Sequence, residues 1–232
     1  MKSTRKLAPV ALIFFLGIAI LASCQKDETS AQVTGNEKTA STTATRSANT
    51  SNCLTNASPE LNQAETDMLT FMREEEKLAR DVYQVMYDQY HIPIFKNINK
   101  SEQYHMNLVL SLLEYYNIPD PASTEPGVFN NEALQQLYND LTAQGLVSLN
   151  EALAAGATIE DKDIFDLGTD MANTSNPAIL CTFEKLTCAS GNHIRSFSAL
   201  LTARGITYVP QYISQEEYDS IISLPHQYCG GY

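Results

Sequence analysis

Four segments of the chain carry large apolar residues at alternating steps of three and four. This spacing is typical of a helix that packs one face against a core and turns the opposite face to solvent. The segments span about 63–90, 98–116, 149–173 and 177–204. The pattern therefore predicts four long amphipathic helices.

Capping residues mark the starts of two of these helices. Asn62 with Glu65, and Ser148 with Glu151, have the spacing of a capping box, in which each residue binds the backbone of the other. Gly156 lies inside the third segment and costs it about 1 kcal/mol of helix propensity. The third helix is therefore expected either to run through Gly156 or to break there.

The links between the predicted helices differ in length. Short links join the first helix to the second and the third to the fourth, which makes two antiparallel pairs. A long link over 118–147 joins the pairs and holds a minor amphipathic piece from Leu134 to Leu141. This connectivity predicts an all-α, ferritin-like four-helix bundle with a long crossover between helices two and three. A short extra helix is expected at about 215–223, and only 206–213 resembles a strand, which Pro210 interrupts.

The first 23 residues differ from the rest of the chain. A basic start precedes an apolar run, and Leu21-Ala22-Ser23-Cys24 ends that run with small residues before a cysteine. This start resembles a bacterial lipoprotein signal peptide. The resemblance implies cleavage before Cys24, lipidation of Cys24, and a protein anchored in the cell envelope on the periplasmic or outer face of a membrane. The alternative is a plain transmembrane anchor, for which the apolar run is short.

Composition divides the remaining chain into two parts. Residues 24–59 are rich in Ser, Thr, Ala and Asn and predict a flexible stalk, because they hold too little apolar surface to offset the entropy of ordering. Residues 60–232 have the size of one domain. The net charge is −12, and about −15 without residues 1–23, so no nucleic-acid partner is expected.

Four cysteines remain if Cys24 is lipidated, namely Cys53, Cys181, Cys188 and Cys229. An even number in an oxidising compartment indicates two disulfides, and free buried thiols are the alternative. Cys181 and Cys188 are about 10 Å apart along one helix, too far for a bond to each other. If the first and fourth helices run the same way, as the predicted bundle requires, Cys53 lies near Cys181 and Cys188 is left for Cys229.

Ionisable residues interrupt the apolar stripe of every predicted long helix. They are Glu76 on the first, Glu102 and His105 on the second, Glu160 and Asp163 on the third, and His193 on the fourth. A buried ionised carboxylate costs several kcal/mol unless a partner compensates its charge. The basic residues nearest in sequence are Lys77, Arg80, Lys162 and Arg195, and they are expected to face outward or to cover the flank. Bound metal ions would then supply the positive charge, and carboxylates with imidazoles suit iron, manganese or zinc.

Each of these residues also has an ordinary structural interpretation. Glu76 belongs to the run Glu74-Glu75-Glu76, which is commonly a solvated face. Single histidines such as His105 and His193 are often core or boundary residues without a ligand role. The metal hypothesis therefore depends on the coincidence of such residues on four helices.

Two motifs resemble those of known di-iron proteins. Glu76-Lys77-Leu78-Ala79-Arg80-Asp81-Val82-Tyr83 is similar to the Glu-x-x-Ala-Arg-x-x-Tyr of the first helix of rubrerythrins, and Glu102-Gln103-Tyr104-His105 matches Glu-x-x-His. Together with Gly191-Asn192-His193, these motifs resemble a prokaryotic ferritin-like family of unknown function over roughly 65–205. The resemblance implies a carboxylate-bridged di-iron centre in which Glu76, Glu102 and His105 bind the first half.

The second half departs from the rubrerythrin pattern. Ser190 stands three residues before His193, where the pattern has a glutamate. Asp163, one turn after Glu160, is the expected substitute, so Glu160, Asp163 and His193 complete the predicted ligand set. If Asp163 does not substitute, the site would hold one metal or bind the second weakly. Ser190, Tyr83 and Tyr104 are expected to support the ligands.

The expected function is that of a di-iron oxidoreductase, a ferroxidase or peroxidase, that reacts with dioxygen or peroxide. Two iron ions are the expected cofactors, with manganese or zinc as alternatives. The Cys-x-x-Cys module of rubrerythrins is absent from this sequence, so an external electron donor is expected. The alternative is a non-enzymatic envelope module that binds metal or another protein. The sequence does not fix the oligomeric state, for which a homodimer is one option.

Overall fold

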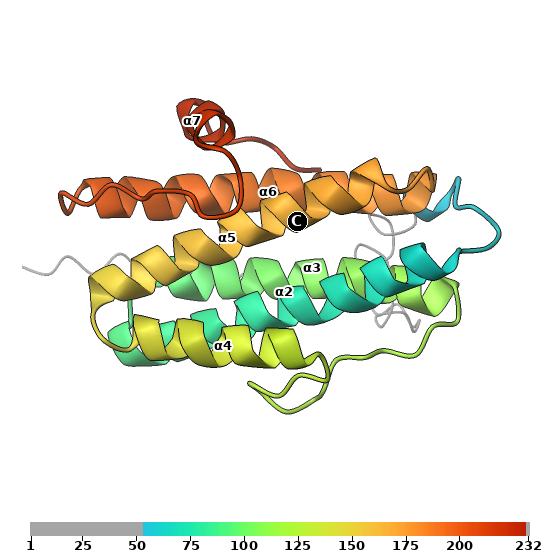
Figure 1. Cartoon of the computed structure of the whole chain (residues 1–232), viewed down its shortest axis with the longest axis horizontal. Coiled ribbons are helices and arrows are strands. Elements are labelled where there is room, and N and C mark those ends of the chain that lie inside the picture. Colours follow the sequence, from blue (N-terminus) through green and yellow to red (C-terminus); the bar gives the residue numbers. More distant parts are fainter. Residues whose placement is uncertain (1–52, 231–232) are drawn as a thin grey trace, which may run out of the picture. The chain divides into compact units, whose positions relative to one another are not determined.

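The computed structural model describes residues 53–230, and every regular element among them is a helix (Figure 1). The helices with described bounds are α2 (Gln63–Tyr90), α3 (Pro93–Tyr115), α4 (Glu132–Gly145), α5 (Leu149–Ala172), α6 (Pro177–Thr202) and α7 (Gln215–Ser223). The all-α prediction is thus confirmed for this part of the chain, and 206–213 forms no strand. No helix between residues 53 and 230 is long and apolar enough to span a bilayer. The predicted signal peptide, Cys24 and most of the predicted stalk lie outside the described residues.

The ends of the first two helices follow from a few local residues. The Asn62 and Glu65 side chains form the predicted capping box at the start of α2. His91 ends α2 in the left-handed conformation, with φ 54°. Pro93 then starts α3 five residues before the expected position, because proline is tolerated in the first turn of a helix. The expected start at residue 98 was therefore wrong.

Gly156 does not break α5, which runs without interruption from Leu149 to Ala172. A Cβ atom at this position would lie 2.5 Å from ring atoms of Phe197 on α6. The glycine therefore gives Phe197 the space to pack directly against the α5 backbone.

The four long helices pack as two pairs, α2 with α3 and α5 with α6 (Figure 1). The pair α2 and α3 is antiparallel, since Arg80 contacts Gln103 while Arg73 contacts Met106. The pair α5 and α6 is antiparallel as well, since Glu160 contacts His193 while Asp163 contacts Ser190. The shorter α4 packs on α2 and α5, and α7 packs on α6.

Two hydrophobic clusters fill the interior at different levels along the helices. One cluster contains Val82, Phe95 and Phe197, and the other contains Leu69 and Phe183. Along each long helix, one end contributes mainly to the first cluster and the other end mainly to the second. The ionisable residues predicted as ligands lie between these two ends. A buried polar layer therefore separates two apolar layers.

Both predicted disulfides are present, Cys53 to Cys181 and Cys188 to Cys229. The first bond draws residues just before α2 against the start of α6. Leu54 packs on the cluster around Phe183, and the Ser58 carbonyl accepts a hydrogen bond from Tyr116. Cys53, Leu54 and Ser58, which we expected to lie in the stalk, are therefore packed against the helices.

Candidate metal centre

The six predicted ligands all lie in the polar layer between the two hydrophobic clusters. Each of these six residues is buried, with at most 8% of its surface exposed. They are Glu76, Glu102, His105, Glu160, Asp163 and His193. The inward orientation predicted for Glu76 thus holds, although the residue lies within an acidic run.

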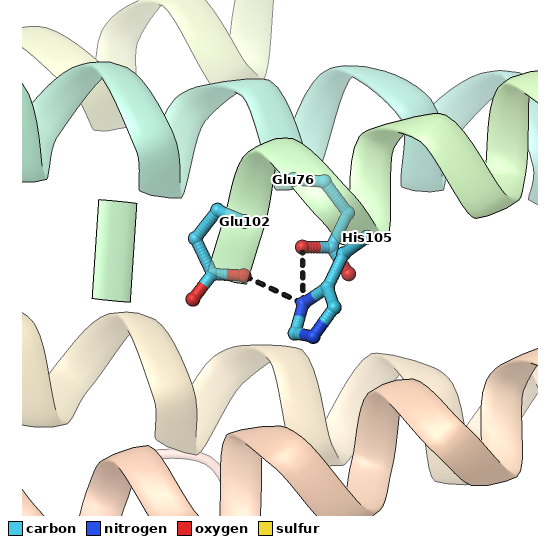
Figure 2. Close-up of side chains that lie close together, drawn as sticks. All are labelled: Glu76, Glu102 and His105. Atoms are coloured by element: carbon cyan, nitrogen blue, oxygen red, sulfur yellow. Dashed lines mark hydrogen bonds and ion pairs between the residues drawn. The ribbon is translucent and has the colours of Figure 1, made fainter. Parts of the chain in front are cut away.

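Three of these residues form a first group, Glu76, Glu102 and His105. Figure 2 shows the two carboxylates converging on the imidazole of His105. Nδ1 of His105 lies 2.6 Å from Oε2 of Glu102 and 3.2 Å from Oε2 of Glu76. Two ligand atoms about 2.1 Å from one metal ion lie roughly 3 Å apart when they subtend a right angle, so this spacing suits shared coordination.

A second group contains Glu102, Glu160 and His193. Nδ1 of His193 lies 3.0 Å from Oε1 of Glu102 and 3.2 Å from Oε2 of Glu160. Glu102 thus belongs to both groups, with one oxygen directed to each histidine. The rings of His105 and His193 stack with their centroids 5.8 Å apart. This geometry describes two neighbouring cation positions that share the Glu102 carboxylate.

The polar layer buries four carboxylates but only two imidazoles, and this imbalance shifts the pKa values of its members. Burial raises the pKa of Glu76 to about 8, against the opposing effect of His105. Burial would also raise the pKa of Glu102, but the imidazoles of His105 and His193 outweigh it and hold that pKa well below its usual value. For His193, burial alone would lower the pKa, yet the carboxylates of Glu160 and Glu102 raise it to about 10. Without metal, the histidines therefore hold protons that bound cations would replace.

Asp163 belongs to neither group, but its carboxylate lies beside them. Burial raises its pKa well above the usual value, and the charges of Glu76 and Glu160 raise it further. Oδ2 accepts a hydrogen bond from the Ser190 hydroxyl, while Oδ1 is buried without a hydrogen-bond partner among residues 53–230. Oε1 of Glu76 is in the same situation. Such uncompensated oxygens, next to two imidazoles, fit a site that binds divalent metal ions.

The tyrosines predicted to support the ligands are placed differently. The hydroxyl of Tyr83 donates a hydrogen bond to Oε1 of Glu160 and also lies 3.3 Å from the Gly156 carbonyl. Tyr83 is fully buried, so this bond can orient Glu160. Tyr104 is only half-buried, and its ring lies 6.5 Å from that of His105.

We expected the nearby basic residues to face outward or to cover the flank, but Lys77 is completely buried. Its ammonium lies 2.6 Å from Asp81 and also donates to the carbonyls of Glu125 and Val128. The segment before α4 covers this face of α2, which the helical pattern of α2 alone could not reveal. Lys77 nevertheless compensates Asp81 and not the candidate centre, whose carboxylates form ion pairs only with His105 and His193 among residues 53–230.

The other members of the acidic run are also buried, which the sequence did not indicate. Glu74 accepts hydrogen bonds from the backbone amides of Asn130 and Asn131. Glu75 accepts a hydrogen bond from Lys162 on α5. Successive helical residues point about 100° apart, so three adjacent glutamates reach three different partners.

Asp161 is a further buried carboxylate that sequence reasoning missed. It accepts hydrogen bonds from the Tyr208 hydroxyl and from the backbone amides of Gln211, Tyr212 and Ile213. These bonds hold the segment after α6 against α5, one residue away from Glu160. Asp161 lies off the main apolar stripe of α5, so the periodic pattern did not indicate its burial. Its position next to Glu160 was the one hint in the sequence that it lies near the centre.

An all-helical protein with a buried glutamate and histidine cluster is the class that this fold and site define. Within it, the chain belongs to the family of the uncharacterized protein domain DUF2202, which matches residues 65–225. It is 49% identical over 164 residues to the uncharacterized protein MJ0754 of Methanocaldococcus jannaschii, covering 70% of this chain and 89% of that protein. A crystal structure of hypothetical protein MJ0754 from Methanococcus jannaschii matches with a TM-score of 0.72 at 47% identity, covering 73% of this chain and 98% of that one.

Proposed function

We propose that the protein is a di-metal carboxylate protein of the ferritin-like class, with two iron ions as its cofactor. The observation that carries this proposal is the sharing of Glu102 by two groups of buried ligand atoms. Two antiparallel helix pairs, joined by a long crossover that contains α4, support the ferritin-like assignment.

Each helix pair would supply the residues specific to one metal position, and Glu102 on α3 would be shared by both. Glu76 and His105 would hold the first ion, and Glu160 and His193 the second. Glu102 would bridge the two ions, and the buried oxygen of Asp163 would supply the donor that Ser190 cannot. Together, four carboxylates would compensate two divalent cations.

The bound irons would supply electrons and Lewis acidity for a reaction with dioxygen or peroxide, as in a ferroxidase or a peroxidase. The chain's own residues would exclude water and fix the ligands. Tyr83 orients Glu160, and Ser190 orients Asp163, through buried hydrogen bonds. An external donor would supply electrons if the oxidant is reduced catalytically.

The proposed location is the bacterial cell envelope, with the protein anchored to a membrane through lipid on Cys24. This part of the proposal is supported by the resemblance of residues 1–24 to a lipoprotein signal peptide. Two disulfides in the helical domain suit an oxidising compartment.

A non-enzymatic metal-binding module of the envelope is the second candidate. Ser190 favours it, because a second bridging carboxylate is missing where rubrerythrins have one. Without that second bridge, one of the two ligand groups could hold a single ion, for example zinc bound by its three protein ligands.

Metal content and oxygen reactivity distinguish the two candidates. The protein is purified without chelators and analysed by mass spectrometry for metals, and the metal-free form is loaded anaerobically with Fe²⁺. Two irons per chain and an absorption band that develops on mixing with oxygen are expected. One tightly held zinc, with no spectral change on exposure to oxygen or peroxide, would rule out the oxidoreductase.

A further inference from the structure

The ammonium of Lys162 occupies a cation-binding position on the seam between α2 and α5. Its Nζ atom lies 2.8 Å from Oε1 of Glu75 and pairs also with Asp166. The rings of Phe71 and Tyr212 flank it, with Nζ at 5.1 and 5.8 Å from their centroids. Carboxylates on two helices and two aromatic faces are a favourable environment for a cation.

The charges at this position do not balance. One ammonium meets two carboxylates, and Oε2 of Glu75 is buried with no hydrogen-bond partner among residues 53–230. A divalent ion would neutralise both carboxylates and could also bind the free oxygen. A small cleft of about 10 Å³, near the size of one water molecule, borders Glu75 and Lys162.

This position lies directly beside the candidate metal centre. Glu75 precedes Glu76 on α2, and Lys162 precedes Asp163 on α5. Adjacent helical residues differ by only 1.5 Å in height and about 100° in direction, so the Glu75–Lys162 pair lies at the level of the centre but to its side. Glu76 and Asp163 each carry a buried oxygen without a hydrogen-bond partner in residues 53–230, and the charge of Asp163 acts on Glu75. Asp163 would therefore be the next acceptor for an ion held by Glu75.

Acidic residues continue from this position along α5. Asp166 and Asp170 follow Lys162 at intervals of four, so the three lie on one helical face. Both aspartates are half-buried, and the side chain of Lys162 is only 17% exposed. The face thus leads from partly exposed carboxylates to the buried centre.

We infer that divalent metal ions reach the centre through the seam between α2 and α5, where Glu75 receives them and the Lys162 ammonium closes the route until it is displaced. This inference rests on the proposed metal centre and adds the path of loading. Lysine suits the closing role because its flexible stem lets the ammonium swing into solvent without disturbing the helices.

Stopped-flow loading of the metal-free protein with Co²⁺ tests this route, because cobalt bound by histidine absorbs in the visible range. Glu75→Gln is expected to slow loading about tenfold while leaving the final amount of bound cobalt unchanged. Lys162→Met is expected to accelerate loading, because the incoming ion no longer competes with an ammonium. If the Glu75–Lys162 ion pair were purely structural, removing either partner should change the loading rate in the same direction. Opposite changes therefore support the route.

Matched variants control for general damage. Glu74→Gln alters a buried neighbour that bonds to backbone amides, and Lys96→Met removes an exposed lysine that lies over the ring of Tyr87. Neither should change the loading rate. Asp166→Asn, at a more exposed position, should slow loading and replaces Glu75→Gln if that variant does not fold.

The outcomes separate the route from the centre. If the wild-type protein binds no cobalt, the proposed metal centre itself fails. If it loads fully, but Glu75→Gln or Asp166→Asn loads at the wild-type rate, or Lys162→Met slows loading, only the inferred route is overturned.

Discussion

The carboxylate of Glu102 on α3 lies 3.0 Å from the imidazole of His193 on α6. The same carboxylate bonds to His105 on its own helix through its other oxygen. One residue therefore joins the two halves of the candidate centre, which are otherwise supplied by separate helix pairs. The three glutamates of the centre should consequently differ in what their loss removes.

Replacing Glu102 with Gln should abolish binding of both metals, because this carboxylate belongs to both groups. Glu76→Gln and Glu160→Gln should each leave one metal bound, since each belongs to a single group. Titration calorimetry with Zn²⁺, followed by metal analysis, measures these stoichiometries. Glu114→Gln, at an exposed position of the same helix, should behave like the wild type. Two metals retained by Glu102→Gln would contradict the bridging role.

Tyr83→Phe should weaken metal binding about tenfold, because the Tyr83 hydroxyl orients Glu160. The lost buried hydrogen bond should also lower the free energy of unfolding by about 1–3 kcal/mol. Tyr90→Phe is the matched control, since that hydroxyl bonds to the Gly145 carbonyl away from the centre. It should lower stability without changing metal affinity, as measured by urea unfolding and competition with a chelating dye. Equal loss of metal affinity in both variants would assign Tyr83 a packing role alone.

The helices could be predicted from the sequence because their buried apolar residues repeat with the period of the helix. The same periodicity placed Glu76, Glu102 and His105 on inward faces, where the structure has them. The Cys53–Cys181 pairing followed from the directions of the helices. These features depend on local periodicity and simple connectivity.

Features that depend on irregular segments could not be predicted in this way. Lys77 is buried because the segment before α4 folds over it, and Asp161 because residues 208–213 return to α5. Neither segment carries a periodic signal that would reveal what it covers. The burial of Glu75 likewise depends on its partner on α5, which the pattern of α2 does not contain.

Asp161→Asn should destabilise the segment that follows α6. An amide has a single acceptor oxygen and presents an NH₂ group to backbone donors that the carboxylate now satisfies. The expected loss is about 2–3 kcal/mol in the free energy of unfolding. Limited proteolysis should cut residues 206–213 faster in this variant. Asp140→Asn, at an exposed position of α4, is the control and should change neither measurement.

Metal binding should stabilise the protein more strongly as the pH rises. In the metal-free protein the pKa of Glu76 is raised from 4.5 to about 8 and that of His193 from 6.5 to about 10. A raised pKa in the folded state stabilises the fold below the unfolded pKa, and this contribution is lost as the pH rises through the folded pKa. This loss runs from about pH 4.5 to pH 8 for Glu76 and from about pH 6.5 to pH 10 for His193, so the metal-free protein should lose stability most steeply between about pH 6.5 and pH 8. A bound metal ion must displace the same protons, which becomes easier as the pH rises, so the increase in Tm on loading with Zn²⁺ should grow across this range.

Thermal unfolding of the loaded and metal-free forms across this pH range measures the effect directly. Glu102→Gln provides the control, because it retains the buried histidines but should bind no metal. Its Tm should be unaffected by Zn²⁺ at every pH. A metal-induced increase in the wild-type Tm that stays constant or shrinks towards pH 9 would show that protons and metal do not compete for Glu76 and His193.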